Sequence, residues 1–145
     1  MGSEELLEAA GNVATEWNHH WLGTEHLLVA YLEAERQAKV KPFLTDAGLK
    51  FDAAEANVRE SAPRRDEREA GHDGYVTTPR IEKIRGFAHG WAFAVSWPDA
   101  PVVTAEHLML GLLVDGQGAG AEAIRKEGVT IDNVIIHMGN RLASG

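Results

Sequence analysis

Two short segments with the same charged side chains stand 81 positions apart in the sequence. WLGTEHLLVAYL contains Glu25 and His26, and VVTAEHLMLGLL contains Glu106 and His107, each pair followed by an apolar run. Both glutamates fall in the first turn of an expected helix, where an acid gains about 0.3–1 kcal/mol from the helix dipole. The same carboxylates could instead bind a cationic group. Helix stabilisation and ligand binding both remain open on this pattern alone.

Histidines close to the first glutamate have the chemistry of metal ligands. His19, His20 and His26 lie within eight residues and, with Glu25, could supply nitrogen and oxygen donors. However, adjacent histidines at a helix end point in different directions, and the sequence has no H-E-x-x-H helix. We therefore predict no metal site and no cofactor. His26 and His107 are expected to be hydrogen-bonded structural residues.

Sequence motifs of catalysis are also missing. The glycine-rich segment GQGAGAE at 116–122 lacks the lysine of a G-x-x-x-x-G-K-[ST] phosphate loop. None of the four serines lies in a nucleophile-elbow context. We predict that the protein is not an enzyme and has no catalytic residues.

Composition narrows the class of protein and of partner. The 145 residues are 44% hydrophobic and 25% charged, with no cysteine, as expected of one globular domain without disulfides. No apolar run reaches the roughly 18–20 residues of a membrane span. A formal charge of −8 repels phosphate backbones and favours cationic partners, including Arg and Lys side chains. We expect a soluble, cytoplasmic protein that binds neither nucleic acid nor membrane.

The elements that carry the two glutamates are helical by pattern. Apolar residues recur at helical spacing in both halves, and no stretch alternates for long enough to predict a sheet. Thr24, Thr78 and Thr104 are expected to be N-caps, and Gly48 and Gly128 to end helices in the left-handed conformation. The predicted fold is all-α, with about eight helices in two pseudo-twofold repeats of four helices.

The repeat also predicts the domain organisation. The polar segment ESAPRRDEREAGHDGYV separates the two copies and is typical of a linker. We predict one domain over 1–145, with repeat one at about 4–60, a linker at about 61–76 and repeat two at about 77–143.

These repeated segments resemble the double Clp N-terminal repeat domain found at the front of ClpC-type Clp ATPases. The resemblance is carried by NHHWLGTEHLLVAYL and DAGLKFDAAEANV, then by TTPRIEKI, TAEHLMLGLL and KEGVTIDNV, and it covers nearly the whole chain. It implies an all-helical pseudo-twofold module that recruits substrates and adaptor proteins to an unfoldase ring. Such a module performs no chemistry itself.

The resemblance also implies a binding site. In family members that recognise phosphorylated arginine, the glutamates of the two Glu-His segments bind the guanidinium, and threonines at helix starts hold the phosphate. These roles carry over to Glu25, Glu106 and Thr78, with Arg80 beside Thr78 in TTPR. The first half has no TTPR-like segment of its own. We therefore expect a complete site only at Glu106, together with Thr78.

A second implied feature is an aromatic-lined groove between the halves, which in some family members binds macrocyclic peptides. Trp21, Thr77 and Trp97 are the corresponding candidates here, with Thr77 where the family usually has an aromatic residue. That substitution weakens the expected groove.

The sequence thus predicts a non-catalytic recognition module of the Clp protein-quality-control system. It would bind adaptors or phosphoarginine-tagged substrates for an AAA+ unfoldase, with a Clp ATPase ring as a further partner. The alternative is a stand-alone homologue without the ATPase, which competes for adaptors, substrates or toxic ligands of the Clp ATPase.

Overall fold

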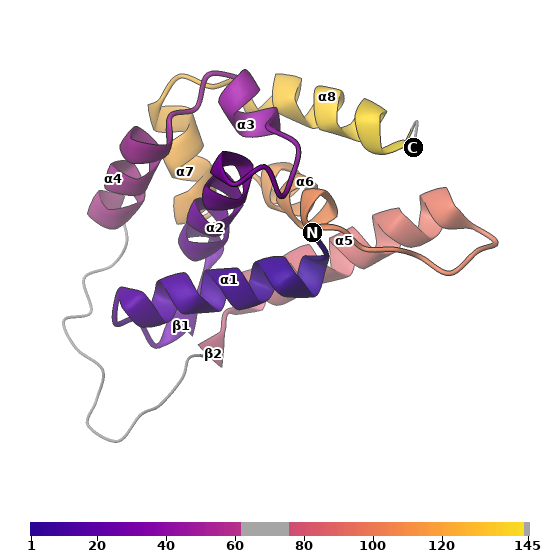
Figure 1. Ribbon diagram of the computed structural model, residues 1–145, viewed down its shortest axis with the longest axis horizontal. Helices are drawn as coiled ribbons and strands as arrows, with labels where there is room; N and C mark the ends of the chain where they lie inside the picture. The colour runs from indigo at the N-terminus through magenta and orange to yellow at the C-terminus, as the bar shows by residue number, and fades with distance from the viewer. Residues whose placement is uncertain (62–75, 144–145) are drawn as a thin grey trace.

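The computed structural model describes residues 1–61 and 76–143, which are mostly helical (Figure 1). These residues form eight helices and two strands of two residues each, which confirms the predicted fold class. In chain order the elements are α1 (Ser3–Glu16), β1 (Trp21–Leu22), α2 (Thr24–Arg36), α3 (Phe43–Asp46), α4 (Phe51–Ser61), β2 (Val76–Thr77), α5 (Pro79–Ser96), α6 (Ala105–Asp115), α7 (Ala119–Lys126) and α8 (Ile131–Ala143).

Local capping chemistry explains where α5 and α6 begin. The hydroxyls of Thr78 and Thr104 accept hydrogen bonds, each 3.4 Å long, from the backbone N–H three residues further on. Pro79 follows Thr78 at the first position of α5, where a missing N–H removes no hydrogen bond of the helix. Both predicted caps are confirmed. The predicted cap at Thr24 is wrong, because Gly23 caps α2 and the Thr24 hydroxyl has a tertiary partner instead.

The repeated histidines have one structural role in both halves. Nδ1 of His26 accepts a hydrogen bond from the Gly23 N–H, and Nδ1 of His107 accepts one from the Thr104 N–H, both at 3.0 Å. Each histidine thus satisfies the N–H of its own N-cap residue, as Glu or Gln does in a capping box. The prediction of hydrogen-bonded structural histidines is confirmed.

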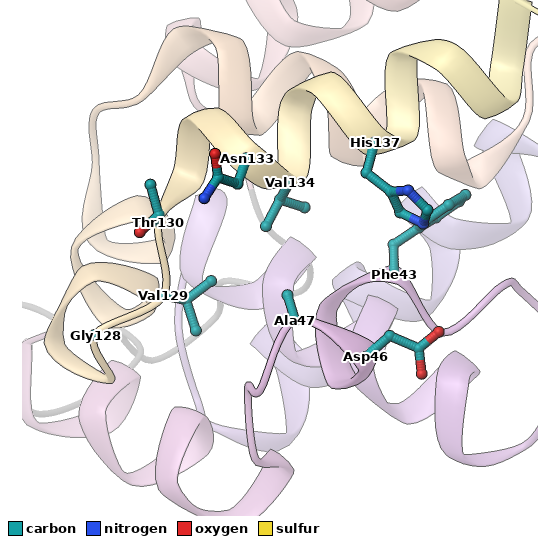
Figure 2. Close-up of a pocket in the computed structure, with 9 residues that line it drawn as sticks. All are labelled: Phe43, Asp46, Ala47, Gly128, Val129, Thr130, Asn133, Val134 and His137. Atoms are coloured by element: carbon teal, nitrogen blue, oxygen red, sulfur yellow. The ribbon is translucent and has the colours of Figure 1, made fainter.

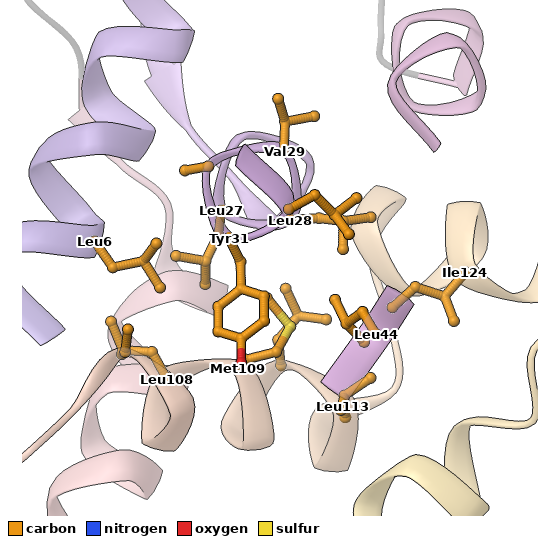
Figure 3. Close-up of a cluster of buried hydrophobic side chains, with 14 of the residues drawn as sticks. Leu6, Leu27, Leu28, Val29, Tyr31, Leu44, Leu108, Met109, Leu113 and Ile124 are labelled. Atoms are coloured by element: carbon orange, nitrogen blue, oxygen red, sulfur yellow. The ribbon is translucent and has the colours of Figure 1, made fainter. Parts of the chain in front are cut away.

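The core lies between the two Glu-His helices. α2 contacts α1, α4 and α7, α6 contacts α5, α8 and α1, and the two helices also contact each other. Figure 3 shows Leu28 and Tyr31 of α2 in one cluster with Met109 and Leu113 of α6, and all four are at most 1% exposed. Full burial of each such apolar side chain stabilises the fold by about 1.5–3 kcal/mol. The Tyr31 hydroxyl donates to the Lys41 carbonyl at 3.1 Å, so its polar end is satisfied.

The two halves are interleaved. The third helix of each half contacts the fourth helix of the other, α3 with α8 and α7 with α4. β1 and β2 pair in parallel with Leu22 opposite Thr77, and the Thr78 N–H donates to the Leu22 carbonyl at 3.1 Å. Before α6, the Ser3 N–H donates to the Val103 carbonyl at 3.0 Å, in an isolated antiparallel bridge between Gly2 and Thr104. Each half therefore pairs its opening segment with the residues at the start of the Glu-His helix of the other half.

Most of the predicted linker at about 61–76 lies outside the described residues. Ser61 ends α4 and Val76 begins β2. No helix in the described part of the chain combines the length and the apolar character that crossing a membrane requires.

A projecting arm distinguishes the second half from the first. α5 has 18 residues and its counterpart α1 has 14. Beyond Ala92, none of the side chains at 93–102 is buried, and Figure 1 shows this part of the chain extending away from the other helices. Trp97 is 68% exposed and lies next to Phe93, with ring centroids 5.3 Å apart. The extra length of the second half therefore includes the end of α5 as well as the connection that follows it.

Candidate functional site

A cleft of about 710 Å³ lies where the Glu-His helix of the first half meets the opening segment of the second. Three helices, α2, α5 and α7, begin at its wall. Their first-turn N–H groups have no partners within the helix, so an anion is favoured there. The lining residues are Trp21, Gly23, Thr24, Glu25, Thr78, Pro79, Arg80, Gly118, Ala119, Glu122 and Lys126.

The glycine-rich turn before α7 brings that helix against the start of α2. Gly118 has a φ of +90°, and a Cβ there would lie 2.8 Å from the Thr24 hydroxyl oxygen. A Cβ on Gly120 would lie 2.7 Å from the Thr24 carbonyl oxygen. The Gly120 N–H donates to the Thr24 hydroxyl at 3.0 Å. Thr24 thus joins two helix starts across the cleft, which is why it does not cap its own helix.

We expect Gly120→Ala to lower the free energy of unfolding by about 1–3 kcal/mol, because overpacking against backbone atoms forces α7 away from α2. The matched control is Gly90→Ala in α5, where an added Cβ meets nothing within 4 Å. That variant should be stabilised by about 0.5–1 kcal/mol, since alanine is the better helix former. Urea denaturation of both variants measures the difference, and equal stabilities would contradict the packing role of Gly120.

Arg80 is held at the rim of the cleft by the buried carboxylate of Asp115. Nη1 of Arg80 donates to Oδ2 of Asp115 at 2.7 Å, and Nζ of Lys83 lies 3.4 Å from Oδ1. Burial alone would raise the pKa of Asp115, but the hydrogen bond and charge of Arg80, together with Lys83, lower it below its usual value. The Arg80 side chain is 37% exposed and lines the cleft, so it is accessible to a ligand.

Glu25 is the acidic side of the cleft, and its carboxylate is already engaged. The residue is 5% exposed, and Nε1–H of Trp21 donates to its Oε1 at 2.6 Å. The Trp21 ring stacks on His19, with centroids 4.1 Å apart and planes 12° apart. The cleft therefore combines a buried carboxylate with Arg80 and three helix N-termini, an arrangement that suits a ligand bearing both a cation and an anion.

The histidines near Glu25 bond to each other. Nδ1 of His19 and Nε2 of His26 lie 2.7 Å apart. Because Nδ1 of His26 accepts from the Gly23 N–H, its proton must be on Nε2, which donates to His19. Burial, with a smaller contribution from His19, lowers the pKa of His26 to about 3. In the residues that the structure describes, no three His, Asp or Glu side chains are grouped to hold a metal ion.

Glu106 occupies the equivalent position in the second half, but its neighbours differ. The segment that pairs there is the chain start, where the Ala105 N–H donates to the Met1 carbonyl at 3.1 Å. Glu4 and Glu5 stand in the first turn of α1, whereas Arg80 stands in the first turn of α5. Glu106 is half-buried, and burial raises its pKa.

The expected pairing of Thr78 with Glu106 is corrected by this geometry. Thr78 and Arg80 line the same cleft as Glu25, because β2 pairs with β1. Glu106 lies instead beside the segment that begins the chain. The first half does have an opening segment, MGS, although it lacks the Thr-Pro-Arg of the second half.

The structure also separates the three residues of the expected aromatic groove. Trp21 lines the cleft. Thr77 is paired with Leu22 in the two-stranded sheet, and Trp97 is on the projecting arm. The grouping of Trp97 with Trp21 is therefore wrong, because the longer α5 carries Trp97 away from the body.

Sequence reasoning missed the contribution of α7 to the cleft. Gly118, Ala119, Glu122 and Lys126 all line it. The alternating glycines of GQGAGAE could have indicated it. Because this segment lacks the lysine of a phosphate loop, its glycines indicate close packing of the backbone instead.

A second, smaller cavity of about 410 Å³ lies between α3 and α8 (Figure 2). Phe43, Ala47, Val129 and Val134 supply apolar surface, and the remaining lining residues are Asp46, Gly128, Thr130, Asn133 and His137. α3 has four residues, whereas its counterpart α7 has eight. The cavity lies beside α8, where the short α3 packs. At the corresponding place in the other half, the longer α7 packs against α4.

The architecture described above is that of the N-terminal domains of Clp and Hsp104 ATPases. The N-terminal domain of the caseinolytic protease associated chaperone ClpD from Arabidopsis thaliana superposes with a TM-score of 0.74 at 17% identity, over 97% of this chain and 94% of that one. The Hsp104 N-terminal domain from Candida albicans gives a TM-score of 0.76 at 14% identity, over 99% and 91%.

A chain from a malarial protein secretion system has the same fold, with a TM-score of 0.72 at 16% identity over 96% of this chain and 90% of that one. No family model matches the sequence. At these identities the likeness establishes the fold alone.

Proposed function

We propose that this chain is a non-catalytic, cytoplasmic recognition module of the Clp protein-quality-control system. It binds adaptors or substrates for an AAA+ unfoldase, and its ligand group is phosphoarginine. The binding site is the cleft of Glu25, Thr78 and Arg80. The same cleft would serve the front domain of a Clp ATPase and a stand-alone homologue that competes for its ligands.

One observation carries this proposal: a buried carboxylate and three helix N-termini line the same cleft. Phosphoarginine has a guanidinium that can donate parallel N–H bonds to a carboxylate, which makes Glu25 its partner. Its phosphate carries negative charge, which the helix N-termini and Arg80 favour. A ligand with only one of these groups would use only one side of the cleft.

Glu106 is the second candidate for a guanidinium contact. It starts the equivalent helix, but Glu4 and Glu5 stand where the other half has Arg80. Two acids near a phosphate repel it, so we expect the Glu106 position to bind phosphoarginine much more weakly.

Calorimetric titration with phosphoarginine is the direct test, with arginine and inorganic phosphate as partial ligands. We expect saturable binding at one site per chain. Each partial ligand should bind at least tenfold more weakly, because losing one charge-assisted hydrogen bond removes about 1.5–3 kcal/mol. Added salt should weaken binding, since charged contacts are screened.

Other outcomes would change the proposal in defined ways. Two equivalent sites would mean that Glu106 needs no Thr-Pro-Arg segment. An absence of phosphoarginine binding, with an adaptor protein still bound, would leave a recognition module with a different ligand. Binding of neither would contradict the proposed function.

A further inference from the structure

The proposed guanidinium partner is already occupied in the free protein. Nε1–H of Trp21 donates to Oε1 of Glu25 at 2.6 Å, a short distance typical of hydrogen bonds to a charged acceptor. Glu25 is 5% exposed, so little of its carboxylate meets solvent. With one oxygen bonded to the indole N–H and the side chain almost wholly buried, this carboxylate is not open to the two parallel N–H bonds of an incoming guanidinium.

Gly23 supplies the space for this closed position of Glu25. A Cβ on Gly23 would clash with Oε1 of Glu25 and lie 2.9 Å from its Cδ and Oε2. The φ of Gly23 is −121°, which any residue can adopt, so the requirement for glycine here is one of space. The carboxylate therefore folds back over a position that has no side chain.

Trp21 is itself held in place from two sides. Its ring stacks on His19, which is hydrogen-bonded to the fully buried His26. Its backbone belongs to β1, where it pairs with Val76 of β2. The indole donor is thus pre-positioned at Glu25, and opening the carboxylate means breaking a contact that the surrounding structure supports.

We propose that Trp21 is an internal competitor that keeps the Glu25 carboxylate closed to guanidinium groups and so lowers their affinity for the cleft. This inference rests on the proposed function. When only a fraction of the protein is open, the apparent affinity for a guanidinium falls by that fraction. A ligand that also binds Arg80 and the helix N-termini recovers this loss, whereas an ordinary arginine side chain does not.

The net charge of the protein gives a physical reason for keeping the Glu25 carboxylate closed. A chain with a formal charge of −8 attracts cationic side chains in general. A permanently open carboxylate in the cleft would be available to unmodified Arg and Lys residues of many proteins. Closing it with Trp21 lowers the affinity for every guanidinium, so that appreciable binding requires further contacts such as those of a phosphate group.

The test is Trp21→Phe, which keeps an aromatic ring for stacking on His19 and removes the N–H donor. We expect phosphoarginine and methylguanidinium each to bind about tenfold more tightly than to the wild type, which corresponds to about 1.4 kcal/mol. Inorganic phosphate, which does not need Glu25, should bind as before. Trp97→Phe on the exposed arm is the matched control and should change none of the three affinities.

Gly23→Ala is a second variant that acts on the same contact from the other side. Its methyl group should displace the flexible end of Glu25 and raise both guanidinium affinities without removing the indole. In the wild type, the Nε1–H resonance of Trp21 should move upfield when phosphoarginine binds, because the short bond to Glu25 is lost.

Three results separate this inference from the proposed function. Suppose that the wild type binds phosphoarginine and that Trp21→Phe and Gly23→Ala bind it with the same or lower affinity. This result would overturn the competitor role of Trp21 and leave the proposed function in place. An equal gain for inorganic phosphate would also overturn it, since the effect would not depend on Glu25. No phosphoarginine binding by the wild type or either variant would overturn the proposed function and this inference with it.

Discussion

Glu25→Gln is expected to lower the affinity for phosphoarginine about 100-fold, since it removes charge-assisted bonds that contribute about 1.5–3 kcal/mol each. The glutamine keeps the size of the side chain and a carbonyl oxygen for the Trp21 N–H, but it cannot offer a charged, two-oxygen acceptor. Titration calorimetry with phosphoarginine measures the change.

Glu106→Gln is the matched control, because Glu106 occupies the same position of its helix. Both variants lose an interaction with a helix dipole, about 0.3–1 kcal/mol, and Glu25→Gln also weakens the bond from Trp21. We expect Glu106→Gln to change phosphoarginine affinity less than about threefold, corresponding to less than 1 kcal/mol. Equal losses in the two variants, or a larger loss for Glu106→Gln, would contradict the assignment of the site to Glu25.

Acid should destabilise the fold through His26. Its pKa is lowered to about 3 in the folded protein, and the ordinary value of 6.5 applies when the chain unfolds. The unfolded chain therefore binds a proton that the folded protein does not, over the window between these two values. The stability that His26 contributes is fully present above pH 6.5 and is lost as the pH falls toward 3. The expected loss is about 2 kcal/mol between pH 6.5 and 5.

His26→Gln isolates this effect. A glutamine at the third helical position can still accept from the Gly23 N–H, as in a capping box, but it does not titrate in this range. Urea denaturation at several pH values should give the variant a flatter pH dependence than the wild type. Its stability at neutral pH should be lower, because the imidazole fills a fully buried position and bonds to His19. Parallel pH profiles would show that the wild-type loss comes from other groups.

Most residues of the cleft could not be assigned from the sequence, and there is a physical reason for this. The two Glu-His segments are locally equivalent, so either glutamate fits the opening segment of either half. The contact between the Thr78 N–H and the Leu22 carbonyl, which brings Thr78 and Arg80 to Glu25, joins residues far apart in the chain. The contribution of α7 depends in the same way on a close approach of Gly118 and Gly120 to Thr24.

The tryptophans illustrate the same limit. Trp21 and Trp97 occupy similar places in the repeat, each in the connection before a Glu-His helix. The structure puts Trp21 against Glu25 and leaves Trp97 68% exposed on the arm. The part of α5 beyond its last buried residue, Ala92, separates these two outcomes.

By itself, the sequence determined the helices, the twofold repeat, the caps at Thr78 and Thr104 and the hydrogen-bonded histidines His26 and His107. These features depend on hydrogen bonds and side-chain spacing within a few residues, which composition and periodicity report directly. Only the tertiary structure decided which glutamate has Thr78 and Arg80 beside it, and that Trp21 covers it. The reason is the interleaving of the halves, in which each opening segment crosses to the Glu-His helix of the other half.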